Sequence, residues 1–405
     1  MPKDFKKLIT IRFLFTFASL IQTIILGWQM YELTHDPLFL GLVGLAEAIP
    51  ALSLALFAGL IVDKGRPLNI FRKILLLSFL SALIIFITQY SPSYFSIKIQ
   101  VISLFLSSIL TGVTRSFAGP TIFSLVPRIV PRDKLPKASA WMTTAIQGAR
   151  IIGPAMGGLF YGLIGVANTT IIICCLFLLA FIATMLVKFN PPPNKKLEST
   201  SIKDNLLIGA KFVYKHKILF PALSLDMVSV FFGGVTALLP IYAAEILKVG
   251  PGGLGILRAS PAFGALLMGP ILAMVNLSHK AGKWLLVSVA GFGFCILAFS
   301  ISKNYSLSIL FLALSGAFDS VSMVVRASIV QLSSPDSMRG RISAVNSMFI
   351  GSSNELGEFE SGFLAKFFGV VPTAFFGGVA CLGTVLVVAS YAKKLRRLNL
   401  KDLSV

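Results

Sequence analysis

Three carboxylates lie near the middle of an apolar segment toward the C-terminal end of the sequence. They are Glu355, Glu358 and Glu360, and Asn354 directly precedes them. The surrounding residues, 341–367, otherwise have the length and composition of a membrane-spanning helix. A charged side chain at mid-bilayer costs roughly 2.5 to 3.5 kcal/mol on insertion scales. Because such residues usually face a bundle interior or a wet cavity, the cluster indicates an ion or substrate pathway.

The spacing of the three carboxylates decides which of them share a helix face. On a helix, Glu355 and Glu358 are three residues apart and share a face, whereas Glu360 points elsewhere. Neighbouring carboxylates resist simultaneous ionisation, so one of the pair can hold a proton near neutral pH. We therefore hypothesise that Glu355 and Glu358 exchange protons with a cavity, and that Glu360 is a weaker candidate. The alternative is a structural ion pair between helices, for example with Arg150 or Arg326.

The composition places these residues in a membrane protein. Hydrophobic residues make up 56% and charged residues 13%, and the mean hydropathy is +0.86, whereas a soluble domain has about 25% charged residues. Apolar runs of roughly 20 residues, long enough to cross a hydrocarbon core as helices, recur with no soluble domain between them. The expected spans, about twelve in number, are residues 8–33, 38–62, 70–90, 98–126, 136–163, 166–188, 217–245, 252–276, 283–302, 305–331, 341–367 and 370–392.

The formal net charge of +20 is distributed over alternate connections between the expected spans. The basic clusters include Lys3, Lys6, Lys7, Lys64, Arg66, Arg72, Lys73, Arg128, Arg132, Lys134, Lys137, Lys195, Lys196, Lys217, Lys393, Lys394, Arg396 and Arg397. By the positive-inside rule, these connections and both termini are cytoplasmic. A nucleic-acid partner is disfavoured, because the basic residues are spread among short loops instead of gathered on one folded face.

The only long polar interruption divides the sequence into two related halves. A shift of 204 residues places Pro131 on Pro335 and aligns the fifth and eleventh spans without a gap. The same shift pairs glycines, namely Gly112 with Gly316, Gly153 with Gly357 and Gly165 with Gly369. An even number of spans per half makes this a parallel repeat, with substrate expected near the midplane between the halves. The predicted parts are a six-helix half at 1–189, a cytoplasmic linker at 190–216, a second six-helix half at 217–392 and a cytoplasmic tail at 393–405.

Other ionisable residues fall within expected spans and predict the lining of a cavity. They are Glu47, Arg115, Arg150, Asp226, Arg258, Asp319 and Arg326. Arg115 and Asp319 match under the shift, so we hypothesise a pair opened by substrate or protons, against the alternative of permanent structural pairing. Glu47 and Asp226 are interpreted as lone acids, which line a solvated cavity wall or act as second proton sites.

Arg150 and Arg258 suit an anionic substrate, because guanidinium matches planar oxyanions. The alternative is that they pair with glutamates. Neither a metal nor a cofactor is expected, because the three histidines fall in or beside loops and no phosphate-binding glycine loop is present. An enzymatic function is therefore not expected.

Several short motifs give the chain a family resemblance. The stretch from Gly59 through Asp63 to Arg66 looks like the cytoplasmic loop signature of the major facilitator superfamily, although its glycine comes one place early. Arg115 with Gly119 resembles a second superfamily motif, in which the arginine takes part in proton coupling. Gly148, followed by Gly153, Pro154, Gly157 and Gly158, is similar to the motif of the family's antiporters and exporters. Ordinary packing of small residues is the alternative explanation of those glycines.

The segments Gly41 to Pro50 and Asn354 to Glu360 narrow the resemblance to the efflux branch that includes enterobactin exporters. The resemblance implies an all-α membrane protein with twelve transmembrane helices in two pseudo-symmetric six-helix halves. It also implies a monomer of the bacterial inner membrane that works by alternating access. We expect proton-coupled efflux of a small amphipathic molecule, such as a siderophore or drug-like compound, with lipid, protons and substrate as the partners. An importer with the same fold is the main alternative, followed by a receptor or scaffold that transports nothing.

Overall fold

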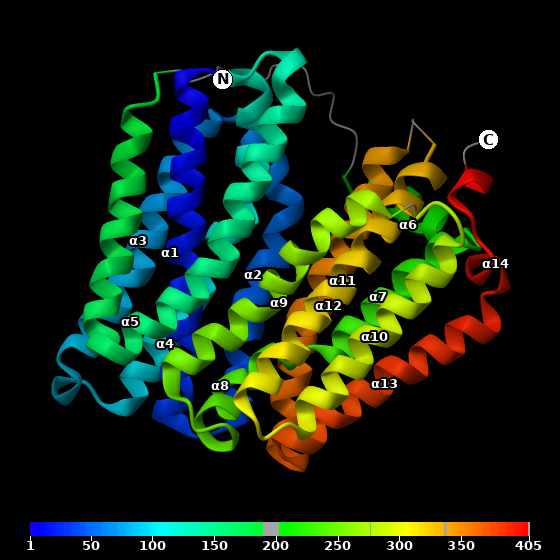
Figure 1. Ribbon diagram of the computed structural model, residues 1–405. Helices are drawn as coiled ribbons and strands as arrows, with labels where there is room; N and C mark the ends of the chain where they lie inside the picture. Colours follow the sequence, from blue (N-terminus) through cyan, green and yellow to red (C-terminus); the bar gives the residue numbers. More distant parts are fainter. Residues whose placement is uncertain (189–201, 276, 336–337, 404–405) are drawn as a thin grey trace. The chain divides into compact units, whose positions relative to one another are not determined.

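The computed structural model describes residues 1–188, 202–275, 277–335 and 338–403, and this part of the chain is almost entirely helical (Figure 1). Ten of its segments are long and apolar enough to cross a membrane. One of them, Arg132–Met185, has a break at Gly165 and therefore holds two spans. A further helix, Arg339–Phe368, is less apolar because it carries the acidic cluster. The all-α membrane fold is therefore confirmed, and the count of twelve spans stays a prediction.

The chain forms two compact units, the first of which comprises Met1–Glu198 and Ala243–Ala259. Its helices are α1 (Lys3–Thr34), α2 (Pro37–Lys64), α3 (Pro67–Tyr90), α4 (Ile97–Ile129) and α5 (Leu135–Met185), with short 3-10 turns at Pro92–Tyr94 and Arg132–Lys134. Helix α1 packs along α5, and α2 along α4. Proline at the first position starts α2 and α3, where its missing N–H costs no hydrogen bond.

A buried polar cluster ties three helices of the first unit together. The Gln22 side-chain nitrogen on α1 donates to the Ser81 hydroxyl on α3 at 2.8 Å and to the Ser107 hydroxyl on α4 at 2.9 Å. All three side chains are buried. Because lipid supplies no driving force for apolar helices to associate, such hydrogen bonds and close packing hold membrane helices together.

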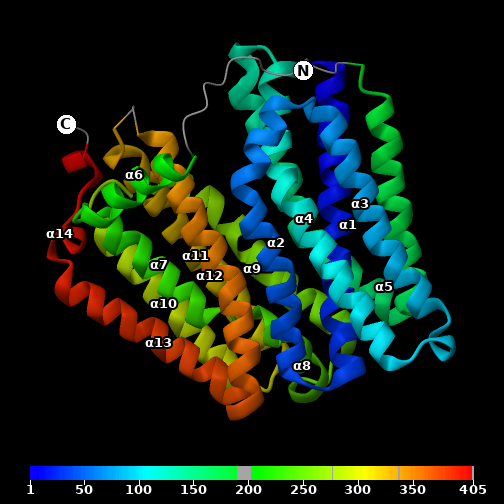
Figure 2. The same ribbon diagram turned by 180° about the vertical axis from the view of Figure 1, so that it is seen from behind.

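The second unit comprises Ser199–Tyr242 and Ser260–Val405. Its helices are α6 (Ile202–Lys215), α7 (Leu219–Gly233), α8 (Leu239–Ile241), the later part of α9 (Gly250–Met274), α10 (Ala281–Ile301), α11 (Tyr305–Ser333), α12 (Arg339–Phe368), α13 (Val370–Tyr391) and α14 (Lys393–Arg396), with short turns at Val235–Leu238 and Leu400–Leu403. The turn Tyr242–Ile246 begins in this unit and continues into the first. Helix α13 runs beside α7 and α10 (Figure 2). Leu219, Leu285 and Ile329 belong to the core that these helices and α11 enclose.

Glycines matched by the sequence repeat make equivalent contacts in the two units. A Cβ on Gly112 would lie 2.1 Å from the Glu47 carbonyl oxygen on α2, and one on Gly316 would lie 2.0 Å from the Pro261 carbonyl oxygen on α9. Both distances are far below van der Waals contact, so only glycine allows these helix crossings. The pseudo-symmetry predicted from the sequence is therefore present in the backbone packing.

The turns that follow the fifth and eleventh spans are also equivalent. Gly165 has a φ of 77° and Gly369 a φ of 87°. Side chains with a Cβ rarely adopt this left-handed region, which glycine enters without steric cost. Each glycine therefore allows a sharp reversal between two spans of its unit.

The predicted linker at 190–216 is helical in its second part. Residues 190–201 lie outside the described residues, and α6 follows them. Helix α6 packs against α12, where a Cβ on Gly209 would lie 2.9 Å from the Arg341 carbonyl oxygen.

The segment Ala243–Ala259 belongs to the first unit, although the sequence places it in the second half. A Cβ on Gly158 of α5 would lie 2.3 Å from the Pro251 carbonyl oxygen, and one on Gly255 would lie 2.4 Å from the Pro154 carbonyl oxygen. The Tyr31 hydroxyl on α1 also donates to the Glu245 carboxylate. Close glycine packing and a charge-assisted hydrogen bond thus attach this segment to α1 and α5.

Replacement of Gly158 by alanine should weaken this attachment. The added methyl group meets backbone atoms that cannot move aside, and overpacking of this kind costs about 1–3 kcal/mol. The Gly162→Ala variant is the control, because its Cβ would lie 3.6 Å from Pro251, which is ordinary contact. We expect a lower thermal unfolding midpoint for the purified Gly158→Ala protein only. Equal midpoints for the two variants would contradict the packing described.

His216 caps the start of α7. Its titration should make the stability of the folded protein depend on pH. Its Nδ1 accepts the N–H groups of Ile218 at 3.3 Å and Leu219 at 3.1 Å. Burial lowers the pKa of the imidazole below its ordinary value of 6.5. As the pH falls below that value, the unfolded chain binds the proton first, so the folded state loses stability.

Thermal unfolding at about pH 7.5 and about pH 5.5 tests this linkage. We expect the wild type to lose more stability on acidification than His216→Asn, because asparagine caps a helix without titrating. The same loss in both proteins would rule out His216 as the titrating group.

Candidate functional site

The acidic cluster lies on α12, in the second unit, with its members in different environments. Glu355 is buried, with 5% of its surface exposed, whereas Glu358 and Glu360 are half-buried and Asn354 is exposed. The Asn354 side chain donates to the Ile350 carbonyl one turn earlier, at 2.9 Å. Glu355 and Glu358 each make a polar or electrostatic interaction with another group. The two residues predicted to exchange protons, Glu355 and Glu358, are therefore at least half-buried, and each interacts with another group of the protein.

Close packing of α12 on α7 fixes the position of the cluster. A Cβ on Gly357 would lie 2.6 Å from the Phe231 carbonyl oxygen, so the two backbones touch between Glu355 and Glu358. The Ser361 hydroxyl lies 3.2 Å from the Gly234 carbonyl oxygen and 3.3 Å from a Glu360 carboxylate oxygen. The carboxylates thus stand where α12 crosses the end of α7.

Two ion pairs connect helices within the units. In the first unit, Arg115 on α4 donates to Glu47 on α2 at 2.9 Å. In the second unit, Arg326 on α11 pairs with Asp226 on α7. The prediction that Glu47 and Asp226 are lone acids is therefore wrong. Sequence spacing could not reveal these partners, because each pair joins helices that are distant in the sequence.

The two ion pairs differ in their exposure. The Arg115 side chain is 55% exposed and that of Glu47 is 13% exposed, whereas the side chains of Arg326 and Asp226 are 5% and 7% exposed. Ser229 and Ser322, each about one turn from a member of the second pair, are buried as well. The Asp226–Arg326 pair is thus enclosed by protein, and the Glu47–Arg115 pair is open on the side of the arginine.

The other residues predicted to line a cavity do not form a single cluster among the described contacts. Arg115 and Asp319 lie in different units, so their predicted pairing stays a prediction, and Asp319 itself is half-buried on α11. Arg150 is exposed on α5, and its guanidinium lies 3.4 Å from the Gln147 side-chain oxygen. Arg258 is half-buried on the part of α9 that belongs to the first unit.

The glycines of the exporter-like motif divide into two kinds. Gly153 and Gly157 pack on α1, where added Cβ atoms would lie 2.9 Å from the Leu20 Cβ and 3.0 Å from the Ile21 Cα. Gly158 packs on the segment Ala243–Ala259, and Pro154 lies inside the same helix. Gly148, by contrast, has open space where its Cβ would be. Close helix contact thus explains three of the four glycines.

The predicted loop signature lies at the junction of α2 and α3. Helix α2 ends at Lys64, and Arg66 occupies the position before the first residue of α3. Gly59 has open space around its Cβ position. The side chain of Asp63 lies outside the described residues, so its part in the loop signature stays a prediction.

Polar and charged residues on α1 form a further group of contacts, which the sequence predictions did not include. The Tyr161 hydroxyl on α5 lies 2.6 Å from a Glu32 carboxylate oxygen and 2.5 Å from the Gln29 side-chain oxygen. The Arg12 guanidinium lies 5.7 Å from the centre of the Phe15 ring, a cation–π contact. Both Arg12 and Glu32 fall within the expected span 8–33, so their charge in an apolar run was the signal that could have found them.

Curated proteins similar to this chain are transporters. The chain is 26% identical to an uncharacterized MFS-type transporter, YvqJ, of Bacillus subtilis over 72% of its own length and 68% of that protein. It is 22% identical to the staphyloferrin A transporter of Staphylococcus aureus over 95% of both. It is 23% identical to the enterobactin exporter EntS of Escherichia coli over 61% of this chain and 58% of the exporter.

Solved transporter structures share the fold at low sequence identity. A POT family transporter in complex with 5-aminolevulinic acid has a TM-score of 0.76 at 12% identity, covering 98% of this chain and 97% of that one. A bacterial homologue of the lysosomal transporter Spinster has a TM-score of 0.71 at 15% identity, covering 98% and 97%. A sequence model described as transmembrane secretion effector, MFS_3, matches residues 2–404. The chain therefore belongs to this family of major facilitator transporters.

Proposed function

We propose that this membrane transporter exports a small amphipathic organic molecule, a siderophore or drug-like compound, in exchange for protons by alternating access. The observation that carries the proposal is the carboxylate cluster of α12, with Glu355 buried inside a span and Glu358 one turn further on. Ionisable residues in such positions mark proton relays and substrate pathways in membrane proteins. Two neighbouring carboxylates supply a site that binds and releases one proton.

The substrate class rests on the relatives and on the exposed arginine. Two of the similar proteins are named for transport of staphyloferrin A and enterobactin, and the first alignment covers 95% of both chains. Arg150, exposed on α5, offers a guanidinium that suits the oxygen-rich anionic groups of siderophores. The exporter direction is proposed from the resemblance of the glycine-proline arrangement of α5, Gly148 to Gly158, to the motif of the family's antiporters and exporters.

The two ion pairs serve different purposes in this proposal. Separation of Glu47 and Arg115 leaves the arginine accessible, so this pair is the one that substrate or protons open during transport. Separation of Asp226 and Arg326 would leave two charges enclosed by protein, which costs several kcal/mol per ion. We therefore assign the second pair to the architecture of its unit. The basic connections support a cytoplasmic position for both termini. We also expect a monomer of the inner membrane, as the family resemblance implies.

Neutralisation of the acidic member of each ion pair should show which pair supports folding and which supports transport. Asp226→Asn leaves Arg326 without its enclosed partner, and breaking a buried pair costs about 3–5 kcal/mol, so we expect little folded protein in the membrane. Glu47→Gln should fold normally, because Arg115 is not enclosed by protein, and should transport slowly, because the pair can no longer form. Folded yield by size-exclusion chromatography and transport in proteoliposomes measure the two effects. Equal yields for both variants would refute the assignment.

A transport assay with Glu355→Gln tests the proposal itself. Inside-out vesicles with an acidic interior should accumulate the exported compound, with enterobactin, staphyloferrin A and ethidium as the probes. We expect the pH gradient to accelerate uptake by the wild type and by Glu360→Gln. Glu355→Gln should lose most of that acceleration, because it cannot release a proton. Unchanged gradient dependence in Glu355→Gln would remove this residue from the coupling, and uptake only under an alkaline interior would indicate an importer.

A further inference from the structure

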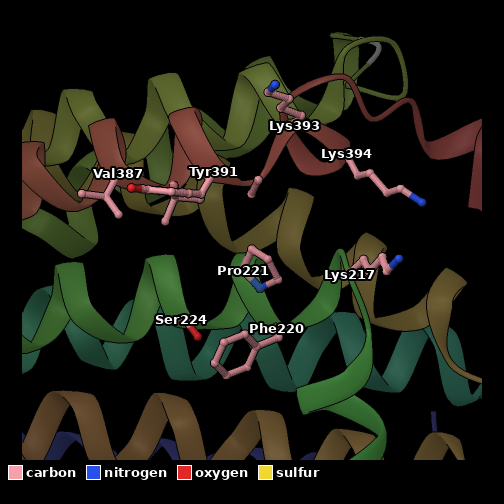
Figure 3. Close-up of a pocket in the computed structure, with 10 residues that line it drawn as sticks. Lys217, Phe220, Pro221, Ser224, Val387, Tyr391, Lys393 and Lys394 are labelled. Atoms are coloured by element: carbon pink, nitrogen blue, oxygen red, sulfur yellow. The ribbon is translucent and has the colours of Figure 1, made fainter.

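A groove of about 460 Å³ lies between the start of α7 and the end of α13, in the second unit (Figure 3). Its walls are apolar and include Phe220, Pro221 and Val387. Tyr391 lies on the α13 side, and Lys217, Lys393 and Lys394 complete the rim. A volume of this size falls within the range of roughly 300–1,000 Å³ that is usual for small-molecule sites.

The groove lies at the end of the unit that the sequence assigns to the cytoplasmic side. Lys217 is two residues before α7, and Lys393 and Lys394 begin α14, one residue after the end of α13. Helix α14 lies at this end of the unit, against α10 and α13 (Figures 1 and 2). The positive-inside rule places these basic residues beside the inner leaflet, where anionic lipids create a negative surface potential.

The apolar part of the groove is open to the surroundings of the protein. Val387 is 57% exposed, Tyr391 86% and Phe220 36%. These residues belong to, or directly adjoin, the membrane-spanning segments Leu219–Ile246 and Val370–Tyr391. Their exposed surface therefore meets lipid, and the hollow between them can take an acyl chain. Tyrosine at the end of a span is typical of the level of the lipid headgroups.

The rim of the groove carries three lysines. Within the described parts of the chain, no carboxylate forms an ion pair with Lys217, Lys393 or Lys394. Figure 3 shows Lys217 and Lys394 extending toward the same end of the groove, beyond its apolar walls. An ammonium group near an anionic membrane surface contributes about 1 kcal/mol of attraction.

We propose that this groove binds one anionic phospholipid of the inner leaflet. One acyl chain lies between Phe220 and Val387, and the phosphate is held by Lys217 and Lys394, with Lys393 nearby. The charges of the rim distinguish this occupant from a zwitterionic lipid, and the exposed apolar walls distinguish it from a free anion. Because the lipid contacts both α7 and α13, its binding stabilises the second unit.

The full-length protein, purified in detergent, allows a direct test. We expect dioleoylphosphatidylglycerol to raise the thermal unfolding midpoint more than dioleoylphosphatidylcholine does, and to remain bound in native mass spectrometry. The combined variant Lys217→Gln, Lys393→Gln and Lys394→Gln should lose both effects. Its matched control is Lys73→Gln, Lys134→Gln and Lys137→Gln, which removes the same charge from exposed lysines on the same predicted side.

A second variant tests the acyl-chain part of the groove independently of its charges. Val387→Trp fills the groove from an exposed position and leaves all three lysines in place. We expect it to fold normally and to lose the retained phosphatidylglycerol. Each of three results would overturn the proposal: equal stabilisation by both lipids, equal loss in the control variant, or full stabilisation by inorganic phosphate alone. None of these measurements depends on transport activity.

Discussion

The absence of water from the hydrocarbon core is the constraint on which this structure depends. Backbone amides there can be satisfied only within a helix, and charged side chains only by other parts of the protein. The described residues follow this rule, with long helices from end to end and with Asp226 and Arg326 paired inside the second unit. Polar side chains such as Gln22 take their partners from neighbouring helices for the same reason.

The same constraint explains the importance of small residues at helix crossings. Burial from water cannot drive two apolar helices together when lipid is as apolar as they are, so close contact supplies the attraction. Gly112 and Gly316 each bring their helix within backbone contact of a neighbour, and their positions match under the repeat. The two units thus share their packing. The units differ in two sequence features. The acidic cluster occurs on α12 and the glycine-proline motif on α5, and neither has a counterpart at the matching positions of the other unit.

The sequence was sufficient to predict the spans and the repeat, because both depend on patterns along one helix at a time. Hydropathy revealed the spans, and matched glycines such as Gly165 and Gly369 revealed the symmetry of the turns. The partners of Glu47 and Asp226 were missed, since a partner depends on how two distant helices rotate against each other. The grouping of Ala243–Ala259 with the first unit was missed for a similar reason. Its contacts with α5, through Gly158 and Gly255, and with α1, through Glu245, reveal it.

Exposure, more than the presence of charge, separates the residues suited to transport from those suited to architecture. An ion pair can open and close in a cycle only if its separated charges are solvated, because an enclosed charge without a partner is too costly. Arg115, with 55% of its side chain exposed, is the candidate for such solvation, and Arg326, at 5%, is not. A buried carboxylate has another way to change state, since a proton neutralises it in place. Glu355 is therefore suited to protonation, and Arg115 to the exchange of partners.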